Sequence, residues 1–266
     1  MNNCGSILYI FWYASENVMT TEIRERAGKS KDIIKKDGKT FFEFTNRTTA
    51  FDGVKKDEFA HKGEVCCKLS AYWFEIMESE GIPTHFRAFV PPNTMEVEHL
   101  EIIPVEVICR NFVAGSLLRR HESGDAVPAG IEPRLGAKIP DPIVEFTTKF
   151  EAVDRPIDYE EIVEKGWLRR EELDSIAECT RKVNNILKRR LSDKGIILAD
   201  FKIEFGKNSA GEILLADEVG TPDGCRFWDL DSYENGEIVS LDKDVYRYDK
   251  GNLSDVYQRI YRRICE

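Results

Sequence analysis

The chain has 266 residues, of which 42% are hydrophobic and 32% are charged. This length and composition predict one large or two modest globular domains and exclude a disordered, collagen-like or coiled-coil protein. Acidic residues outnumber basic ones by 48 to 38, giving a net charge of −10. A general nucleic-acid-binding protein needs a basic surface, so we expect no nucleic-acid partner.

The N-terminal sequence and the cysteine pattern indicate the cellular compartment of the protein. The long apolar run Ile7–Ala14 is too short to cross a bilayer and lacks the flanks of a signal peptide. We therefore expect no membrane segment and interpret residues 1–19 as an N-terminal extension without a functional signal. Seven cysteines occur without a Cys-x-x-Cys pair or zinc-finger spacing, which predicts reduced cysteines in a cytoplasmic protein.

Short strands dominate the pattern from residue 20 to about residue 104. One β-rich run is Lys39–Phe44, which follows the turn signal Asp37-Gly38. A helix is predicted over Ser70–Ser79, because apolar residues recur there at helical spacing and Gly81 ends the pattern.

A glycine lies among lysines in the segment Gly28-Lys29-Ser30-Lys31. Gly-Lys-Ser is the end of a P-loop, but Ile23 stands where that motif needs its first glycine. Two interpretations stay open. The segment is a glycine hairpin that lays backbone N–H groups and lysines over nucleotide phosphates, or it is a plain charged turn.

A second phosphate-binding pattern follows the extended apolar run Leu100–Cys109. Gly115-Ser116 opens an apparent helix, whose free N–H groups, hydroxyl and positive dipole end suit an anion. Arg110 adds a bidentate donor. The alternative is an ordinary capped helix with a structural arginine. From His121 to Pro142 glycines and prolines leave no periodic pattern, which is typical of a lid or substrate-binding loop.

The second half begins with the clearest helical pattern, Glu171–Leu191. A strand over Ile196–Gly206, a tight turn and a second strand over Glu212–Glu218 follow. A final helix is predicted over Ser254–Ile264, with Ser254 as its N-cap.

The predicted hairpin carries two carboxylates. Asp200, Lys202 and Glu204 share one face of its first strand. With a four-residue turn over Asn208–Gly211, Lys202 lies opposite Asp217, and Glu204 is a diagonal neighbour within reach of a shared ion. A five-residue turn would move Asp217 to the other face. Two carboxylates plus substrate phosphates are a usual Mg²⁺ site, and the alternative is a surface charge ladder.

At these residues the chain resembles a known family, the SAICAR synthetases (phosphoribosylaminoimidazole-succinocarboxamide synthases). Ile102–Ser116 is similar to one family signature, and Leu198–Gly206 resembles the second, Asp-x-Lys-apolar-Glu-Phe-Gly. The resemblance runs from about Arg26 to the C-terminus. Shorter matches are Gly28–Lys31, Thr49–Gly53, Gly81–Thr84, Asp217-Glu218 and Pro222–Asp229.

The resemblance implies an ATP-dependent carbon–nitrogen ligase of purine biosynthesis. It would join 5-amino-1-(5-phospho-D-ribosyl)imidazole-4-carboxylate (CAIR) to L-aspartate through an acyl phosphate, giving SAICAR, ADP and phosphate. The implied fold is α+β, with a strand-rich, kinase-like nucleotide-binding domain over residues 20–103. A larger substrate- and metal-binding domain over residues 104–266 would complete the ATP cleft. ATP and Mg²⁺ are the implied cofactors, and the oligomeric state, including a homo-oligomer, stays open.

The resemblance also implies a role for each matching residue. The nucleotide would be held by Gly28, Lys29 and Lys31 at its phosphates and by the backbone of Glu101 and Ile102 at its adenine. Mg²⁺ would be held by Glu204 and Asp217. CAIR would be bound at its phosphate and nearby by Arg110, Ser116, Arg226 and Asp223, and its carboxylate would face the catalytic pair Lys202 and Asp200.

Two segments depart from the family pattern. Cys66-Cys67 stands where the family usually has an Asn-containing sequence, and a His-Asp-Pro motif appears here as Asp154-Arg155-Pro156. Lys149 is a weaker site candidate. A small-molecule kinase and a nucleotide-binding module without catalysis are the rival functions. The sequence offers no Ser/His/Asp or Cys/His nucleophile, which agrees with a ligase that activates a carboxylate by phosphorylation.

Overall fold

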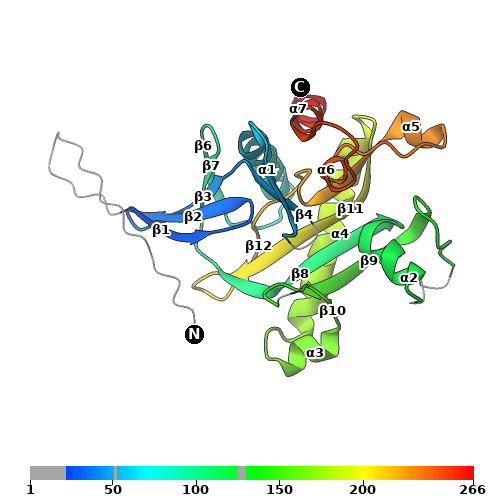
Figure 1. Cartoon of the computed structure of the whole chain (residues 1–266). Coiled ribbons are helices and arrows are strands. Elements are labelled where there is room, and N and C mark those ends of the chain that lie inside the picture. Colours follow the sequence, from blue (N-terminus) through cyan, green and yellow to red (C-terminus); the bar gives the residue numbers. More distant parts are fainter. Residues whose placement is uncertain (1–21, 51–52, 125–129, 152) are drawn as a thin grey trace.

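The computed structural model of the chain describes residues 22–50, 53–124, 130–151 and 153–266. The N-terminal extension, residues 1–19, lies outside the described residues, and so do Phe51 and Asp52 of the short match Thr49–Gly53. Figure 1 shows β-sheets covered by helices. This mixed content agrees with the expected combination of strands and helices.

The described N-terminal strands form a five-stranded antiparallel sheet in the order β1-β2-β3-β7-β6. Its strands are β1 Glu22–Ala27, β2 Lys31–Lys36, β3 Lys39–Phe44, β6 Phe86–Val90 and β7 Thr94–Val97. The run predicted from the sequence is β3, and its alternation buries Phe42 and Phe44. A hairpin of β4 (Arg47–Ala50) and β5 (Lys55–Glu58) stands beside this sheet.

The helix predicted over Ser70–Ser79 is α1, which starts earlier, at Lys62, and ends at Ser79. Val65, Cys66 and Leu69 are buried and extend its apolar face toward the N-terminus. Cysteine behaves here as a small apolar residue. The prediction counted only larger apolar side chains and therefore began the helix too late. Helix α1 packs on β3, β6 and β7.

The larger sheet has the strand order β10-β9-β8-β11-β12 among the described residues, and β13 also pairs with β11. Its strands are β8 Glu101–Phe112, β9 Lys138–Thr148, β10 Pro156–Ile157, β11 Ile196–Lys207, β12 Ile213–Ala216 and β13 Cys225–Asp229. The apolar run Leu100–Cys109 is thus largely β8. The expected domain boundary at residues 103/104 falls inside this strand, and the division into domains stays a prediction.

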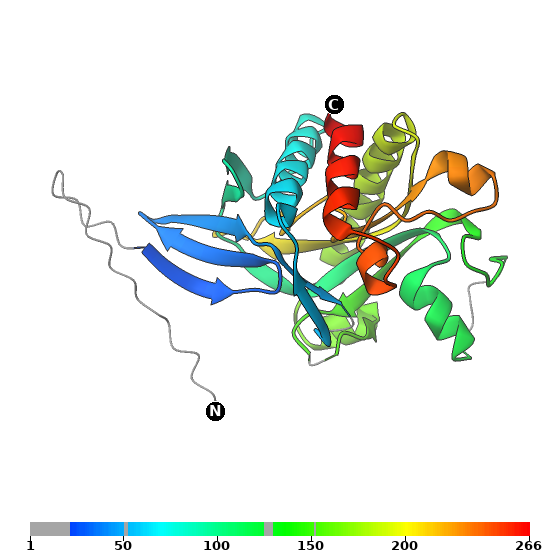
Figure 2. The same ribbon diagram turned by 45° about the horizontal axis from the view of Figure 1, so that its top comes forward.

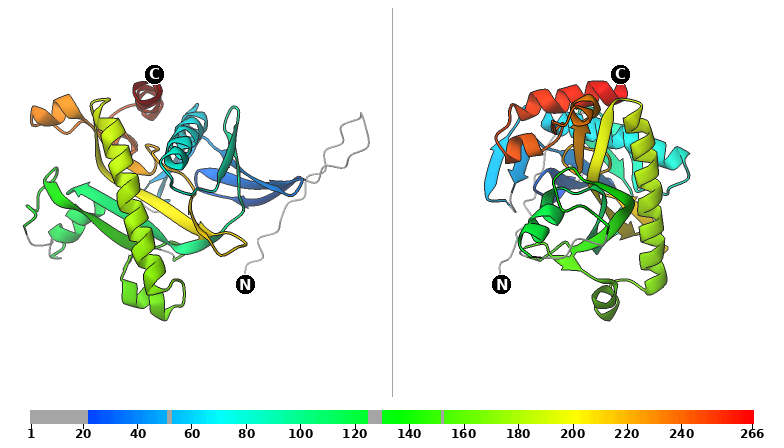
Figure 3. Two further views of the ribbon diagram at one scale, coloured as in Figure 1. Left: turned by 180° about the vertical axis from the view of Figure 1, so that it is seen from behind. Right: turned by 90° about the vertical axis from the view of Figure 1, so that its right-hand side faces the viewer.

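Helices cover the sheets. The remaining ones are α2 Gly115–Glu122, α3 Tyr159–Glu164, α4 Arg170–Ser192, α5 Leu230–Glu234, α6 Asp244–Arg247 and α7 Leu253–Cys265. The predicted helix Glu171–Leu191 is α4, which crosses β8, β9 and β11 (Figure 3, left). Figure 2 shows α1, α7 and α4 on the same side of the sheets. No described helix is both long enough and apolar enough to span a bilayer.

The N-cap of the last helix was predicted wrongly. Helix α7 is capped by Asn252, whose Oδ1 accepts hydrogen bonds from the backbone N–H groups of Ser254 (2.9 Å) and Asp255 (3.5 Å). Ser254 therefore lies inside the first turn. Asn and Ser are nearly equivalent N-cap residues, so the sequence pattern alone does not separate two candidates two positions apart.

The long loop predicted over His121–Pro142 is shorter than expected. Helix α2 continues to Glu122, and β9 begins at Lys138. The start of β9 was not predicted because it contains Pro140 and Pro142, and proline is rare inside strands. The structure accommodates them on a strand whose pairing with β10 is limited to Phe146 and Thr147. Residues 125–129 lie outside the description, and a role as a lid stays a prediction.

The turn of the β11–β12 hairpin corrects the predicted register. Lys207 pairs with Ile213 and Glu204 with Ala216, so the connection has five residues, Asn208–Glu212, rather than four. Asn208 stabilises the wider loop: its backbone N–H donates to the Glu212 carbonyl (3.0 Å), and its Oδ1 accepts from the Glu212 N–H (2.9 Å). Lys202 does not lie opposite Asp217, and strand alternation alone would turn Asp217 away from Glu204.

The loop after β12 depends on a buried glycine. Gly220 has φ +66°, and a Cβ at this position would overlap the Trp73 indole of α1. We predict that Gly220→Ala lowers the free energy of unfolding by about 2 kcal/mol or more, through backbone strain and overpacking. Urea denaturation measures this change.

Gly211→Ala is the matched control. Gly211 has φ +81°, but a Cβ there would meet no atom within 4 Å, so only the strain of about 1 kcal/mol remains. Equal losses in the two variants would contradict the packing role of Gly220.

Candidate active site

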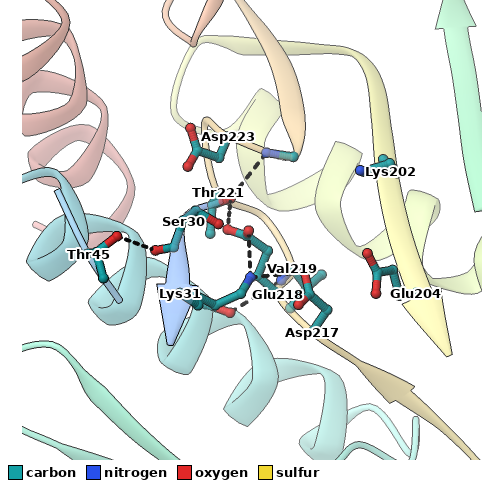
Figure 4. A network of polar contacts seen from close by, with 12 residues as sticks. Ser30, Lys31, Thr45, Lys202, Glu204, Asp217, Glu218, Val219, Thr221 and Asp223 are labelled. Carbon is teal, nitrogen blue, oxygen red and sulfur yellow. Dashed lines mark hydrogen bonds and ion pairs between the residues drawn. The ribbon is translucent and has the colours of Figure 1, made fainter. Parts of the chain in front are cut away.

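Two buried or partly buried carboxylates meet where β11 and β12 lie side by side. Glu204 is on β11, and Asp217 follows the last residue of β12. Asp217 has φ +63°, a left-handed conformation that breaks the alternation of the strand. Its carboxylate consequently lies on the side of Glu204 (Figure 4). The predicted pair is present, although the predicted cause, a four-residue turn, was wrong.

The two carboxylates affect each other's ionisation. Burial and the neighbouring Asp217 charge raise the pKa of Glu204. Burial acts in the same direction on Asp217, but the ammonium groups of Lys31, Lys149 and Lys202 together outweigh it and lower the pKa of Asp217. Asp217 is thus held ionised, whereas Glu204 resists ionisation. A cation between the two carboxylates would stabilise the form in which both are ionised.

Lysine side chains surround this pair. Lys31 Nζ lies 2.9 Å from Asp217 Oδ2 and 2.7 Å from Glu218 Oε1 (Figure 4). Lys149 forms an ion pair with Glu204, so the weaker sequence candidate belongs to the site. Lys202 lies on the face of β11 that carries Glu204.

Glu106 is a site residue that the sequence interpretation missed. It is the cross-strand neighbour of Glu204, and its Oε1 lies 2.5 Å from Lys202 Nζ. Although burial opposes its charge, Glu106 and Glu204 raise the pKa of Lys202 and keep it an ammonium. The alternation of β8 was the available signal, since Glu106 and Arg110 share its polar face between buried Val105 and Val107.

The glycine segment forms the predicted hairpin. It connects β1 and β2, and the Gly28 N–H donates to the Lys31 carbonyl (2.8 Å). A Cβ on Gly28 would lie 2.5 Å from that oxygen, so the turn requires glycine. Lys29 is exposed, whereas Lys31 is buried against the carboxylates. This difference favours a site role for Lys31 over a plain charged turn.

An apolar cluster adjoins the carboxylates. Leu100, Leu214 and Ala216 are buried together, and Ile102 packs against them. Glu101 and Ile102, the segment expected to hold adenine, begin β8 and pair with Lys207 and Gly206 of β11. Ile102 is the partly buried member of this group, and an apolar side chain beside charged groups suits a base whose phosphates extend toward lysines.

The predicted anion-binding residues converge at the other end of β11. Arg110 Nη2 donates to Ser116 Oγ (2.8 Å), and a Cβ on Gly115 would lie 2.7 Å from Arg226 Nη1. Asp200 Oδ2 lies 2.5 Å from Arg226 Nη1 and 3.5 Å from Arg110 Nη1. The structure thus brings Arg110, Ser116, Arg226 and Asp200 together.

Further carboxylates, not expected from the sequence, hold these arginines in place. Glu145 on β9 forms ion pairs with Arg110 and Arg120, and the second measures 2.8 Å. Asp244 of α6 contacts Arg226 at 2.7 Å. Such partners fix guanidinium groups before an anion arrives. Glu145 and Asp244 are far in sequence from Arg110 and Arg226, so no local sequence pattern predicts these contacts.

Asp223 lies in a different environment from the other predicted substrate residues. Its carboxylate forms an ion pair with buried Lys62, lies 3.5 Å from Lys243 Nζ and accepts a hydrogen bond from Tyr257 OH (2.8 Å). These contacts tie the loop after β12 to α1 and α7. The substrate role of Asp223 stays a prediction.

The segments that depart from the family pattern are held by burial and by ion pairs. Cys66 and Cys67 are buried in α1, and burial raises the pKa of both thiols. Arg155 is half-exposed and forms ion pairs with Glu151 and Glu161. These contacts give structural roles to the residues concerned.

The donor set fits a divalent cation that brings further ligands. No group of three or more His, Cys, Asp or Glu side chains suited to a metal occurs among the described residues. Within the described residues, the protein ligands available to a cation here are therefore the two carboxylates of Glu204 and Asp217. Mg²⁺ accepts such a site because it keeps several waters and binds substrate phosphates.

Comparisons with known proteins identify the family of the chain. The family model of SAICAR synthetase matches residues 25–264. A phosphoribosylaminoimidazole-succinocarboxamide synthase from Pyrococcus abyssi is 45% identical over 239 residues, 89% of this chain and 95% of the relative. A structure of a SAICAR synthetase in complex with ADP has 43% identity and a TM-score of 0.81, covering 90% of this chain and 97% of that one.

A more distant structure shows the same fold. The enzyme of this name from Ehrlichia chaffeensis is 30% identical, with a TM-score of 0.82 over 91% of this chain and 98% of that one. The family match covers nearly the whole chain, including both signatures. The chain therefore belongs to the SAICAR synthetase family and is a ligase of purine biosynthesis.

Proposed function

We propose that the chain joins CAIR to L-aspartate in the cytoplasm, converting ATP to ADP and phosphate and releasing SAICAR. The family name supports the substrate pair, and the relative that is bound to ADP supports the nucleotide. The observation that carries the proposal is the arrangement of β11. One face of this strand presents Glu204 beside Asp217, then Lys202, then Asp200 between the arginines.

The spacing along β11 suits a substrate with charge at both ends. Asp200 and Glu204 are four residues apart, or about 13 Å along a strand. The phosphate of CAIR would bind Arg110, Ser116 and Arg226, which offer charge-assisted hydrogen bonds. Its imidazole carboxylate would then extend along the strand toward Lys202. Asp223 would act near this substrate through the loop after β12.

The nucleotide would approach from the opposite end. Its adenine would contact the backbone of Glu101 and Ile102 beside the apolar cluster, and its phosphates would lie against Gly28, Lys29 and Lys31. Glu204 and Asp217 would hold Mg²⁺, which supplies positive charge to the phosphates. The nucleotide-binding part would comprise residues 20–103 and the substrate-binding part residues 104–266.

The chemistry needs positioning and charge neutralisation rather than a protein nucleophile. An oxygen of the CAIR carboxylate attacks the γ-phosphorus in line, the bond from that phosphorus to the β-phosphate oxygen breaks, and ADP leaves. The amine of aspartate then attacks the acyl carbon. The amide bond forms, and the bond from the acyl carbon to the bridging oxygen breaks. Phosphate departs with that oxygen and the electron pair of the broken bond, and the amine loses a proton.

The lysines carry the electrostatic part of the proposal. Lys31, Lys149 and Lys202 approach the carboxylates from different elements, and the raised pKa of Lys202 keeps its charge. As ammonium groups they would neutralise charge that develops during phosphoryl transfer. Asp200 would orient Arg226 and Arg110 rather than exchange protons.

The reaction itself is the first test. A coupled assay measures the release of ADP from ATP in the presence of CAIR. Sustained ADP release should require L-aspartate. An acyl phosphate without its amine acceptor gives no amide product. Sustained ADP formation and a phosphorylated CAIR derivative without aspartate would identify a kinase instead. ADP binding without turnover would identify a binding module.

The metal role of Asp217 gives a second prediction. Asp217→Asn should reduce kcat/KM by about 100-fold or more and raise the Mg²⁺ concentration needed for half-maximal rate, because the cation loses a charged ligand. Initial rates across a Mg²⁺ titration measure both effects. Asp231→Asn, at an exposed position of α5, is the control and should match the parent protein. An unchanged Mg²⁺ requirement in Asp217→Asn would contradict the metal role.

The anion site gives a third prediction. Arg110→Ala should raise the KM for CAIR about 10-fold or more and change the KM for ATP little, because a charge-assisted bond to the substrate phosphate is lost. Steady-state kinetics with each substrate varied separates these effects. Arg134→Ala, at a largely exposed arginine, serves as the control. Equal increases in both KM values would remove Arg110 from the CAIR site.

A further inference from the structure

The arginines of the anion site belong to one continuous network of ion pairs. Asp200 Oδ2 lies 3.5 Å from Arg110 Nη1 and 2.5 Å from Arg226 Nη1. Glu145 accepts a hydrogen bond from Arg110 Nε (2.9 Å), and Asp244 accepts one from Arg226 Nε (2.7 Å). Glu145 and Asp244 each bind a second arginine as well. The network therefore extends beyond Arg110 and Arg226 in both directions.

The two arginines at the ends of the network were not among the expected site residues. Arg120 Nη2 of α2 donates to Glu145 Oε2 (2.8 Å), and Arg247 Nη1 of α6 donates to Asp244 Oδ1 (2.6 Å). From one end to the other, the members of the network are Arg120, Glu145, Arg110, Asp200, Arg226, Asp244 and Arg247. Positive and negative groups alternate, with an arginine at each end.

The net charge of this network determines whether it attracts an anion. The two inner arginines alone are outnumbered by the three carboxylates that contact them, which would give a net charge of −1. The two end arginines change the net charge to +1. A phosphate monoester carries a charge of about −1.5 to −2 at neutral pH. It would be repelled without the end arginines and attracted with them.

A further carboxylate nearby, Asp242, does not remove the need for the end arginines. It is buried, and its oxygens accept hydrogen bonds from the backbone N–H groups of Phe227 (2.8 Å) and Asp244 (2.6 Å). Burial and the Asp244 charge raise the pKa of Asp242 to about 7. Any charge that Asp242 carries is negative and makes the surroundings less favourable to an anion.

Burial makes the Glu145 charge important for Arg110. The Arg110 side chain is 2% exposed, whereas the side chain of Arg120 is 25% exposed. In the poorly screened surroundings of Arg110, a carboxylate in direct contact offsets much of the attraction that the guanidinium exerts on another anion. Arg120 binds the second oxygen of Glu145 and compensates its charge.

Helix α2 places Arg120 at the anion site. Arg120 follows Ser116 by four residues, so both side chains lie on one face of the helix, a turn apart. Ser116 Oγ accepts a hydrogen bond from Arg110 (2.8 Å), and Glu145 of β9 joins Arg110 to Arg120. The contacts of Arg110 therefore connect two positions on this face of α2.

We propose that Arg120 is a charge-balancing residue of the substrate site. It neutralises Glu145, so that Arg110 keeps its attraction for the phosphate monoester of the substrate. Arg120 acts through Glu145 and Arg110 and is a positioning residue, not a ligand of the phosphate. This inference rests on the proposed binding of the CAIR phosphate by Arg110 and Arg226.

Steady-state kinetics of the full chain tests the inference. Arg120→Ala lowers the net charge of the network from +1 to zero. It should raise the KM for CAIR about 5-fold or more, because one positive charge is lost from poorly screened surroundings. The kcat at saturating CAIR and the KM for ATP should change less than about 2-fold, since uniform binding of one substrate is lost.

Arg119→Ala is the matched control. It removes the same side chain and the same charge from the neighbouring position of α2, where Arg119 is exposed. Its KM for CAIR should stay within about 2-fold of the parent value, because exposed charges are well screened.

Two further variants separate charge from packing. Arg120→Lys keeps the positive charge and should raise the KM for CAIR by less than about 3-fold. Arg120→Ala combined with Glu145→Gln removes one positive and one negative charge, so its KM for CAIR should be lower than that of Arg120→Ala alone. An unchanged KM in Arg120→Ala, an equal increase in Arg119→Ala, or a double variant no better than Arg120→Ala would overturn the inference.

Arg110→Ala distinguishes the two levels of the proposal. If it raises the KM for CAIR while Arg120→Ala does not, the phosphate site stands and the role of Arg120 fails. If Arg110→Ala leaves the KM for CAIR unchanged, the phosphate site fails, and the inference about Arg120 fails with it.

Discussion

The proposed chemistry depends on two carboxylates, Glu204 and Asp217, that lie side by side where β11 meets the end of β12. Burial and mutual repulsion oppose this arrangement, as the raised pKa of Glu204 indicates. The chain balances the pair with ammonium groups from separate elements, Lys31 on β2 and Lys149 just after β9. The same lysines are then available for nucleotide phosphates. The ion pairs between these lysines and the carboxylates are thus the contacts that substrate binding would rearrange.

A similar balance occurs at the anion end of β11. Arg110 and Arg226 are nearly buried and are held by Glu145, Asp200 and Asp244. Removing one partner from such a network would leave an unpaired buried charge, which is costly. The strand between the two ends carries Lys202 with Glu106. Charge therefore alternates along this face of β11, and each cation has a carboxylate partner.

The sequence predicted the main strands and helices and the site residues at the two ends of β11. It predicted the loops and turns that connect these elements less well. The signatures located Glu204, Lys202, Asp200, Arg110 and Ser116, because strand alternation and helix-start chemistry are local properties. The turn of the β11–β12 hairpin was wrong by one residue, since the Asn208 side chain stabilises a wider loop. The left-handed backbone of Asp217 compensates for that difference. No local pattern reveals this conformation, because the surroundings of Asp217 come from distant parts of the chain: residues 83–85 pair with Leu215, and Lys31 contacts the Asp217 carboxylate. Glu145 and Asp244 were missed for the same reason, as their partners are distant in sequence.

In the proposed mechanism Glu204 and Asp217 share one divalent cation with the nucleotide. A crystal structure of the protein with Mn²⁺ and a non-hydrolysable ATP analogue, with anomalous data that locate manganese, tests it most directly. We expect an anomalous peak within about 2.5 Å of an oxygen from each carboxylate, with Asp217 still left-handed and the phosphates beside Lys31. A peak bound only by phosphates, or manganese elsewhere while both carboxylates keep their lysine partners, would contradict it.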